Sequence, residues 1–249
     1  MTVTLREVAV WARDYAFAAR MHVRSAIDVR PPRLRGMPGA RVHVILIPGV
    51  VERWPFMEPL AKRMIAAGHA VHFLPELDRH TVPVREAAVI VGAAVDRVAA
   101  AHPHAQIVLV GHSKGGLSGK RLLIDRASEP TAPQPAGLVA LAPPFAGSSR
   151  ARLLVRVPAI RELDPSDERL LALAAERGAD RRIRVVLPRL DPHIPDNAFP
   201  EGVAGVRLRA SGHFRPLATR EAARAVLAAI DELAPAPHDQ DDPARADRS

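Results

Sequence analysis

Short apolar runs alternate with longer amphipathic segments along most of this chain of 249 residues. Six runs have the length of strands and cover residues 42–47, 70–74, 106–110, 137–142, 183–187 and 203–210. The first four are almost continuously apolar, which is typical of strands that helices cover on both faces. Segments 56–67, 84–101, 115–127 and 221–233 have the length and apolar spacing of helices. This alternation predicts an α/β fold with a mainly parallel, doubly wound sheet of about six strands.

Residues 41–234 form the predicted main domain. Three segments do not follow the alternation: one before this domain, one inserted within it and one after it. Residues 1–40 contain a helix at 5–27, with apolar residues at helical spacing (Leu5, Val8, Ala12, Tyr15, Ala19, Val23 and Ala26). We expect this helix to pack its aromatic side chains on the main domain, with contact to a membrane surface or partner protein as the less favoured alternative. An insertion at about 144–182 holds a helix at 167–177, and residues 235–249 are predicted to be a disordered tail.

Composition narrows the classes of function. The absence of cysteine excludes disulfides, thiolate chemistry and Cys-based metal sites. The net charge of +8 does not indicate nucleic-acid binding, because the basic residues are scattered and only 4% of residues are aromatic. No run of 18 apolar residues occurs, and the first 30 residues carry charges throughout. We therefore expect a cytoplasmic protein with no membrane span and no signal peptide.

The strongest chemical signal is the pentapeptide Gly111-His112-Ser113-Lys114-Gly115. It follows a predicted buried strand and opens a predicted helix, the context that a nucleophile elbow requires. Glycines at 111 and 115 permit a sharp turn without Cβ clashes, so that the Ser113 hydroxyl is presented at the carboxyl end of the strand. We therefore predict that Ser113 is a nucleophile.

A serine nucleophile needs a base, and the base needs an orienting acid, which are expected in the chain order Ser, acid, His. The histidines after Ser113 are His193, His213 and His238, and only His213 directly follows the last predicted strand. For the acid, Asp191 lies at the carboxyl end of the preceding predicted strand. We favour His213 and Asp191. The rival acids are Asp196 in the same loop and, less plausibly, Asp164 and Asp167 in the insertion.

The oxyanion formed during attack needs preorganised N–H donors. One is predicted to be the backbone amide of Lys114, and the other the amide of Val50 in the loop after the first strand, where Gly49 lets the backbone turn. A Ser–Lys mechanism is disfavoured, because adjacent residues at a helix start point apart and the Lys114 ammonium should face solvent or a partner carboxylate. No metal-ligand spacing, G-x-G-x-x-G motif or phosphate loop occurs, so neither a metal nor a cofactor is expected.

With the elbow, the Pro48-Gly49 loop, Asp191 and His213, residues 42–233 resemble the α/β-hydrolase family, and bacterial lipases and esterases most closely. The resemblance implies that 145–182 forms a cap over the site. The chain departs from the pattern at Pro48, where many members carry His, and at Lys114, which is often Met or Gln in lipases. The segment 143–189 carries ten arginines and six acidic residues, and such a basic cap suits a soluble ester or an acyl substrate with a negative group.

The function expected from these residues is hydrolysis of a small carboxylic ester through an acyl-enzyme on Ser113. A thioesterase or an acyltransferase would use the same triad with a different acceptor. A non-catalytic binding module with this fold is the alternative from another class, because a fold does not guarantee activity.

Overall fold

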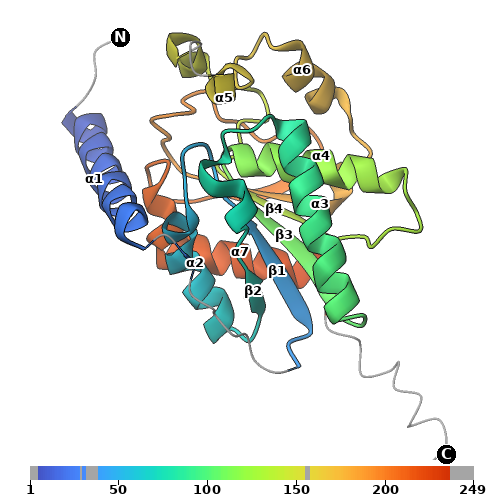
Figure 1. Ribbon diagram of the computed structural model, residues 1–249. Coiled ribbons are helices and arrows are strands. Elements are labelled where there is room, and N and C mark those ends of the chain that lie inside the picture. The colour runs from blue at the N-terminus through green and yellow to red at the C-terminus, as the bar shows by residue number, and fades with distance from the viewer. Residues whose placement is uncertain (1–4, 29, 32–38, 155–157, 236–249) are drawn as a thin grey trace, which may run out of the picture.

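The computed structural model describes residues 5–28, 30–31, 39–154 and 158–235 (Figure 1). Its centre is one fully parallel sheet in the order β2-β1-β3-β4-β5-β6, which confirms the predicted sheet. The strands are β1 (Val42–Ile47), β2 (Ala70–His72), β3 (Gln106–His112), β4 (Gly137–Leu141), β5 (Ile183–Leu187) and β6 (Ala204–Arg207). Because β2 and β3 lie on opposite sides of β1, the carboxyl ends of β1 and β3 meet at a switch point, where α/β sheets form their sites.

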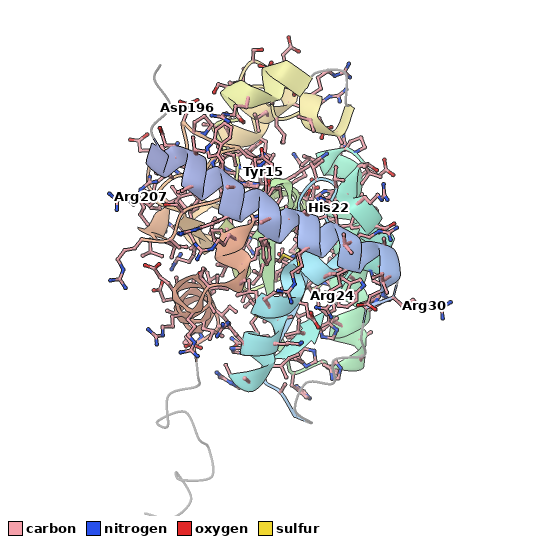
Figure 2. The ribbon with its side chains drawn as sticks, turned by 90° about the vertical axis from the view of Figure 1, so that its left-hand side faces the viewer. Tyr15, His22, Arg24, Arg30, Asp196 and Arg207 are labelled. Atoms are coloured by element: carbon pink, nitrogen blue, oxygen red, sulfur yellow. The ribbon has the colours of Figure 1, made fainter. Side chains whose placement is uncertain are left out.

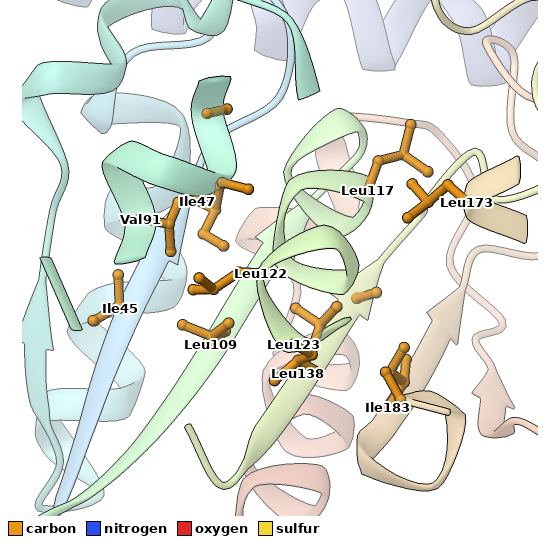
Figure 3. Close-up of a cluster of buried hydrophobic side chains, with 14 of the residues drawn as sticks. Ile45, Ile47, Val91, Leu109, Leu117, Leu122, Leu123, Leu138, Leu173 and Ile183 are labelled. Carbon is orange, nitrogen blue, oxygen red and sulfur yellow. The ribbon is translucent and has the colours of Figure 1, made fainter. Parts of the chain in front are cut away.

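Helices cover both faces of this sheet. They are α2 (Trp54–Ala66), α3 (Val84–Ala101), α4 (Lys114–Ala127) and α7 (Arg220–Leu233), and their bounds differ by two residues or fewer from the predicted ones. Strand side chains alternate between two buried clusters: Ile45, Leu109 and Leu138 pack with α3 and α4 (Figure 3), and Val44, Val110 and Val139 with α2 and α7. Burial on both faces explains the continuously apolar strand sequences.

The helix α1 (Leu5–Ile27) lies on the outside of the domain against α2 (Figures 1 and 2). Its inner face carries Asp14, Ala18, Met21 and Ser25, which are all buried. Phe17 packs edge-to-face on Phe56, as expected for an aromatic of this helix, but Tyr15 is 46% exposed.

The regularly spaced apolar stripe of α1 faces outward, contrary to the packing that its spacing predicted. Val8 is 52% exposed and Val23 63% exposed. The physical reason is that polar contacts orient the helix: the buried Asp14 binds backbone amides of the domain, and Arg24 forms an ion pair with Glu58 of α2. Ala18 and Met21 on the same inner face add apolar contacts with the core.

The insertion between β4 and β5 forms short helices at one end of the molecule (Figure 1). They are the 3₁₀ helix η2 (Ser149–Leu154), α5 (Pro158–Arg161), α6 (Glu168–Ala175) and the 3₁₀ helix η3 (Asp180–Arg182). Asp167 caps α6 by accepting the amides of Arg169 and Leu170, which explains where this predicted helix begins. Residues 236–249 of the predicted tail lie outside the described residues. Over the described part of the chain, no helix combines the length and apolarity needed to cross a bilayer.

Candidate active site

Ser113 occupies the sharp turn between β3 and α4 with φ 51° and ψ −124°, a strained conformation for a residue other than glycine. The turn depends on the two glycines of the pentapeptide. A Cβ on Gly111 would lie 2.5 Å from the Gly115 carbonyl carbon, and one on Gly115 would lie 2.3 Å from the Ile47 oxygen. The Ser113 amide donates to Leu141 O at 2.9 Å, so β4 holds the turn in place. The predicted elbow geometry is therefore present.

His213 and Asp191 form a buried pair next to this turn. The imidazole Nδ1 donates to Asp191 Oδ2 at 2.9 Å, and Asp191 Oδ1 accepts the amides of His193 and Ile194 at 2.8 and 3.0 Å. Gly212 N donates to Leu190 O at 2.8 Å, which holds the loops after β5 and β6 side by side.

The electrostatics of this pair favour its charged forms. Burial alone would raise the pKa of Asp191, but the His213 ring and the two amides hold it below the usual value. Burial alone would lower the pKa of His213, but the Asp191 carboxylate raises it above the usual value. The arrangement can therefore stabilise an imidazolium while keeping the carboxylate ionised.

The rival acids accept hydrogen bonds elsewhere, and the rival His193 does not take the place of His213. Asp196 accepts the Ser149 hydroxyl at 2.8 Å, Asp164 accepts the amide and hydroxyl of Ser166, and Asp167 caps α6. His193 lies beside His213 with ring centroids 4.8 Å apart, and burial lowers its pKa to about 3. His238 lies outside the described residues.

A second buried carboxylate–imidazole pair, which the sequence analysis missed, lies beneath the elbow. Glu52 Oε1 is 2.7 Å from His112 Nδ1, and His112 Nε2 is 3.0 Å from His213 O. Glu52 Oε2 accepts the Gly49 amide at 2.7 Å. The available signal was an acidic residue three positions after Gly49 and a histidine inside the pentapeptide, both at carboxyl ends of predicted strands.

The loop after β1 lies directly against the elbow, since a Cβ on Gly49 would be 3.0 Å from Ser113 Cβ. Of the four successive amides at 49–52, three donate hydrogen bonds within the protein. Gly49 N donates to the Glu52 side chain, Val51 N to Arg79 O at 2.6 Å, and Glu52 N to Gly49 O. The Val50 amide has no hydrogen-bond partner among the described residues. The Lys114 amide is the first of α4 and belongs to the N–H groups that a helix cannot satisfy internally.

His80, another residue that the sequence analysis missed, braces the same loop. Its Nδ1 donates to Pro48 O at 2.6 Å, and its Nε2 accepts the Ser118 hydroxyl at 3.1 Å. Burial lowers the pKa of His80 to about 4, so the ring is neutral at pH 7. Val51, Arg79 and His80 all have positive φ, so backbone strain gathers in the segments around Ser113.

Lys114 is fully buried, which corrects the solvent-facing alternative, and it faces a carboxylate as the other alternative predicted. Its Nζ is 3.1 Å from Glu162 Oε2 and donates to Val82 O and Ala159 O at 2.8 and 3.2 Å. Burial lowers its pKa, and Glu162 opposes that shift. Lys114 thereby ties α4 to the insertion.

Several arginines of the basic insertion are already engaged, which weakens the inference of a basic cap. Arg177 pairs with Asp180 at 2.9 Å, Arg182 donates to Leu123 O at 3.1 Å, and Arg150 stacks over Trp11. A cavity of about 620 Å³ lies between α3, α4 and α6, and Ser113, Asp191 and His213 do not line it. Among the described residues no cluster of three or more His, Asp or Glu side chains could hold a metal ion.

Comparisons with known proteins identify the fold. No protein-family model and no curated protein matches the sequence significantly. A metagenomic carboxyl esterase superposes with a TM-score of 0.59 at 18% identity, over 82% of this chain and 79% of the other. A lipase from Bacillus licheniformis gives 0.59 at 12% identity over 82% and 96%, and lipase B from Aspergillus fumigatus gives 0.58 at 16% identity over 72% and 47%. With the parallel sheet and the elbow, these similarities establish that the chain has the α/β-hydrolase fold.

Proposed function

We propose that this protein is a serine hydrolase that cleaves a carboxylic ester, with Ser113 as nucleophile, His213 as base and Asp191 as the orienting acid. The observation that carries the proposal is the 2.9 Å His213–Asp191 hydrogen bond beside a serine in strained elbow geometry. The names of the similar structures, carboxyl esterase and lipase, agree with it.

In the proposed reaction Ser113 Oγ attacks the ester carbonyl while His213 Nε2 takes the hydroxyl proton. The amides of Val50 and Lys114 stabilise the oxyanion, in accordance with the unused Val50 amide and the unsatisfied start of α4. The imidazolium then protonates the leaving alcohol, and water hydrolyses the acyl-enzyme with His213 again as base. Ser113 makes no hydrogen bond to His213 among the described residues, and such contacts commonly tighten only when substrate binds.

The test is labelling by a fluorophosphonate probe, which reacts with an activated serine. We expect wild type and the control Ser128→Ala to label and Ser113→Ala to remain unlabelled, since Ser128 is exposed at the end of α4. Absence of Ser113-dependent labelling would support the non-catalytic alternative.

A substrate panel then tests which acyl donor is cleaved and which acceptor takes the acyl group. An esterase and a thioesterase use the same triad, so turnover of short to long acyl esters and of coenzyme A thioesters by the same preparation separates the two. Acyl transfer to an added alcohol in preference to water would indicate an acyltransferase.

A further inference from the structure

The inner face of α1 carries a carboxylate that binds the loop of the proposed catalytic histidine. Asp14 is completely buried. Its Oδ2 accepts the amide of His213 at 2.9 Å, and its Oδ1 accepts the amides of Phe214 and Arg215 at 2.9 and 2.7 Å. These amides lead into the 3₁₀ helix η4 (Arg215–Ala218), where N–H groups lack helical partners. Asp14 therefore caps η4 from a position 199 residues before His213.

The backbone before His213 is shaped for this carboxylate. Gly212 has φ +117°, a conformation that residues with a side chain rarely adopt, and a Cβ there would lie 2.4 Å from Asp14 Oδ1. The close approach of Asp14 therefore requires glycine at 212.

Independent contacts fix α1 so that Asp14 stays in position. Arg53 Nη1 donates to Ser25 O at 2.9 Å, and Trp54 Nε1 donates to Asp28 O at 3.0 Å. Both donors belong to the segment that follows the proposed oxyanion loop. Figure 2 shows α1 crossing one face of the molecule, with Tyr15 and Arg24 labelled along it.

We propose that Asp14 is a positioning residue of the active site, an inference that rests on the proposed function. It holds the backbone of the His213 loop so that the imidazole reaches Ser113, and its charge stabilises the imidazolium that forms during attack. His213 is then held at three points: its side chain by Asp191, its carbonyl by His112 and its amide by Asp14. Within α1, this role belongs to Asp14 alone.

The charged and titratable groups around His213 define what this role predicts. They are Asp191 and His193 after β5, Glu52 after β1, His112 at the end of β3, Asp14 on α1 and Arg215 in the loop itself. Burial lowers the pKa of His213, while Asp191, Glu52 and Asp14 raise it. Loss of the Asp14 charge should therefore lower that pKa.

Asp14→Asn tests the role, because it keeps the side-chain size but removes the charge and turns an NH₂ group toward a backbone N–H. We expect kcat/KM on a chromogenic ester to fall roughly 10- to 100-fold, mainly through kcat. The acid limb of the pH profile should also move to lower pH. Asp28→Asn is the matched control: it removes a carboxylate from the end of the same helix, where Asp28 pairs with Arg24, and should leave both unchanged.

An NMR titration of the His213 ring, assigned with His213→Asn, provides a readout that does not need activity. We expect a lower pKa in Asp14→Asn than in wild type and Asp28→Asn. If wild type fails to label with the fluorophosphonate while this shift is present, the proposed function fails and the electrostatic coupling of Asp14 to His213 stands. A folded Asp14→Asn protein with unchanged kcat and unchanged titration would reduce Asp14 to a structural cap and overturn the inference.

Discussion

His112 Nε2 lies 3.0 Å from the backbone oxygen of His213, so the residue before the proposed nucleophile hydrogen-bonds to the proposed base. A carbonyl only accepts, so Nε2 donates. Burial alone would raise the pKa of Glu52, but His112 and the Gly49 amide hold it below the usual value, so the Glu52 carboxylate accepts at Oε1 from the His112 ring. This pair joins the loops after β1, β3 and β6.

Glu52→Gln should destabilise the protein, because it removes the buried carboxylate that accepts from the His112 ring and from the Gly49 amide. We expect the free energy of unfolding to fall by about 2 kcal/mol, measured by denaturant titration. Glu129→Gln, at a surface carboxylate that is 62% exposed, is the control and should change little. A Glu52→Gln protein as stable as this control would contradict the buried-pair interpretation.

The pH dependence of activity should report the His213–Asp191 pair. His213 must be neutral to accept the Ser113 proton, and its pKa is held above 6.5, mainly by Asp191 acting against burial. The acid limb of kcat/KM should therefore lie above pH 6.5 in wild type. Asp191→Asn should move that limb to lower pH and reduce kcat by roughly 10³- to 10⁴-fold.

Asp196→Asn is the matched control for this experiment, because Asp196 belongs to the same loop but accepts from Ser149. It should leave the limb and kcat unchanged. If Asp196→Asn lost more activity than Asp191→Asn, the acid would be wrongly assigned.

The sheet could be predicted from the sequence because its strands are buried on both faces and are bounded by helices with clear spacing. β3 and α4 in particular leave no other place for the Ser113 turn. The orientation of α1 could not be predicted: its best apolar stripe, with Val8 and Val23, faces outward. Helical spacing measures only local amphipathicity, whereas the buried Asp14 contacts a loop 199 residues later.

Some residues of the candidate site follow from local sequence patterns, and others depend on contacts that form only in the folded protein. Ser113, Asp191 and His213 each follow a recognisable strand, so chain order and strand ends suffice to select them. Glu52 contacts the His112 ring, His112 contacts the backbone of His213, and His80 contacts the backbone of Pro48. These contacts exist only once the strands are paired. His80 reaches Pro48 O from a turn with positive φ, which no spacing pattern in the sequence indicates.

Acid should destabilise the fold through His80. In the unfolded chain a histidine titrates near 6.5, whereas the pKa of the buried His80 is about 4. Between these values the unfolded state binds more protons, so the free energy of unfolding decreases as the pH is lowered, by up to about 3 kcal/mol at pH 4 from this group. His72 and His193, with lowered pKa values of about 4 and about 3, act in the same direction.

His80→Asn isolates the contribution of His80, because its amide can still donate to Pro48 O but does not titrate. Denaturant titrations between pH 7 and pH 4 should show a smaller loss of stability in this variant than in wild type. The exposed His104, replaced in the same way, should keep the wild-type slope. Equal slopes in wild type and His80→Asn would refute the assignment.

Lys114 should act as an anchor of the insertion and not as a chemical base. Lys114→Met leaves Glu162, whose side chain is only 12% exposed, with only the exposed Arg169 as a cation at 4.0 Å, and should cost about 3 kcal/mol of stability. The backbone amide at 114 remains, so kcat of the folded fraction should not collapse. Lys114→Met combined with Glu162→Leu removes both charges and should recover much of the loss, because paired apolar replacements are often near neutral. Denaturant titrations of the two single variants and the double variant measure this coupling. A loss of kcat comparable to that of Ser113→Ala, with stability intact, would instead favour a Ser–Lys mechanism.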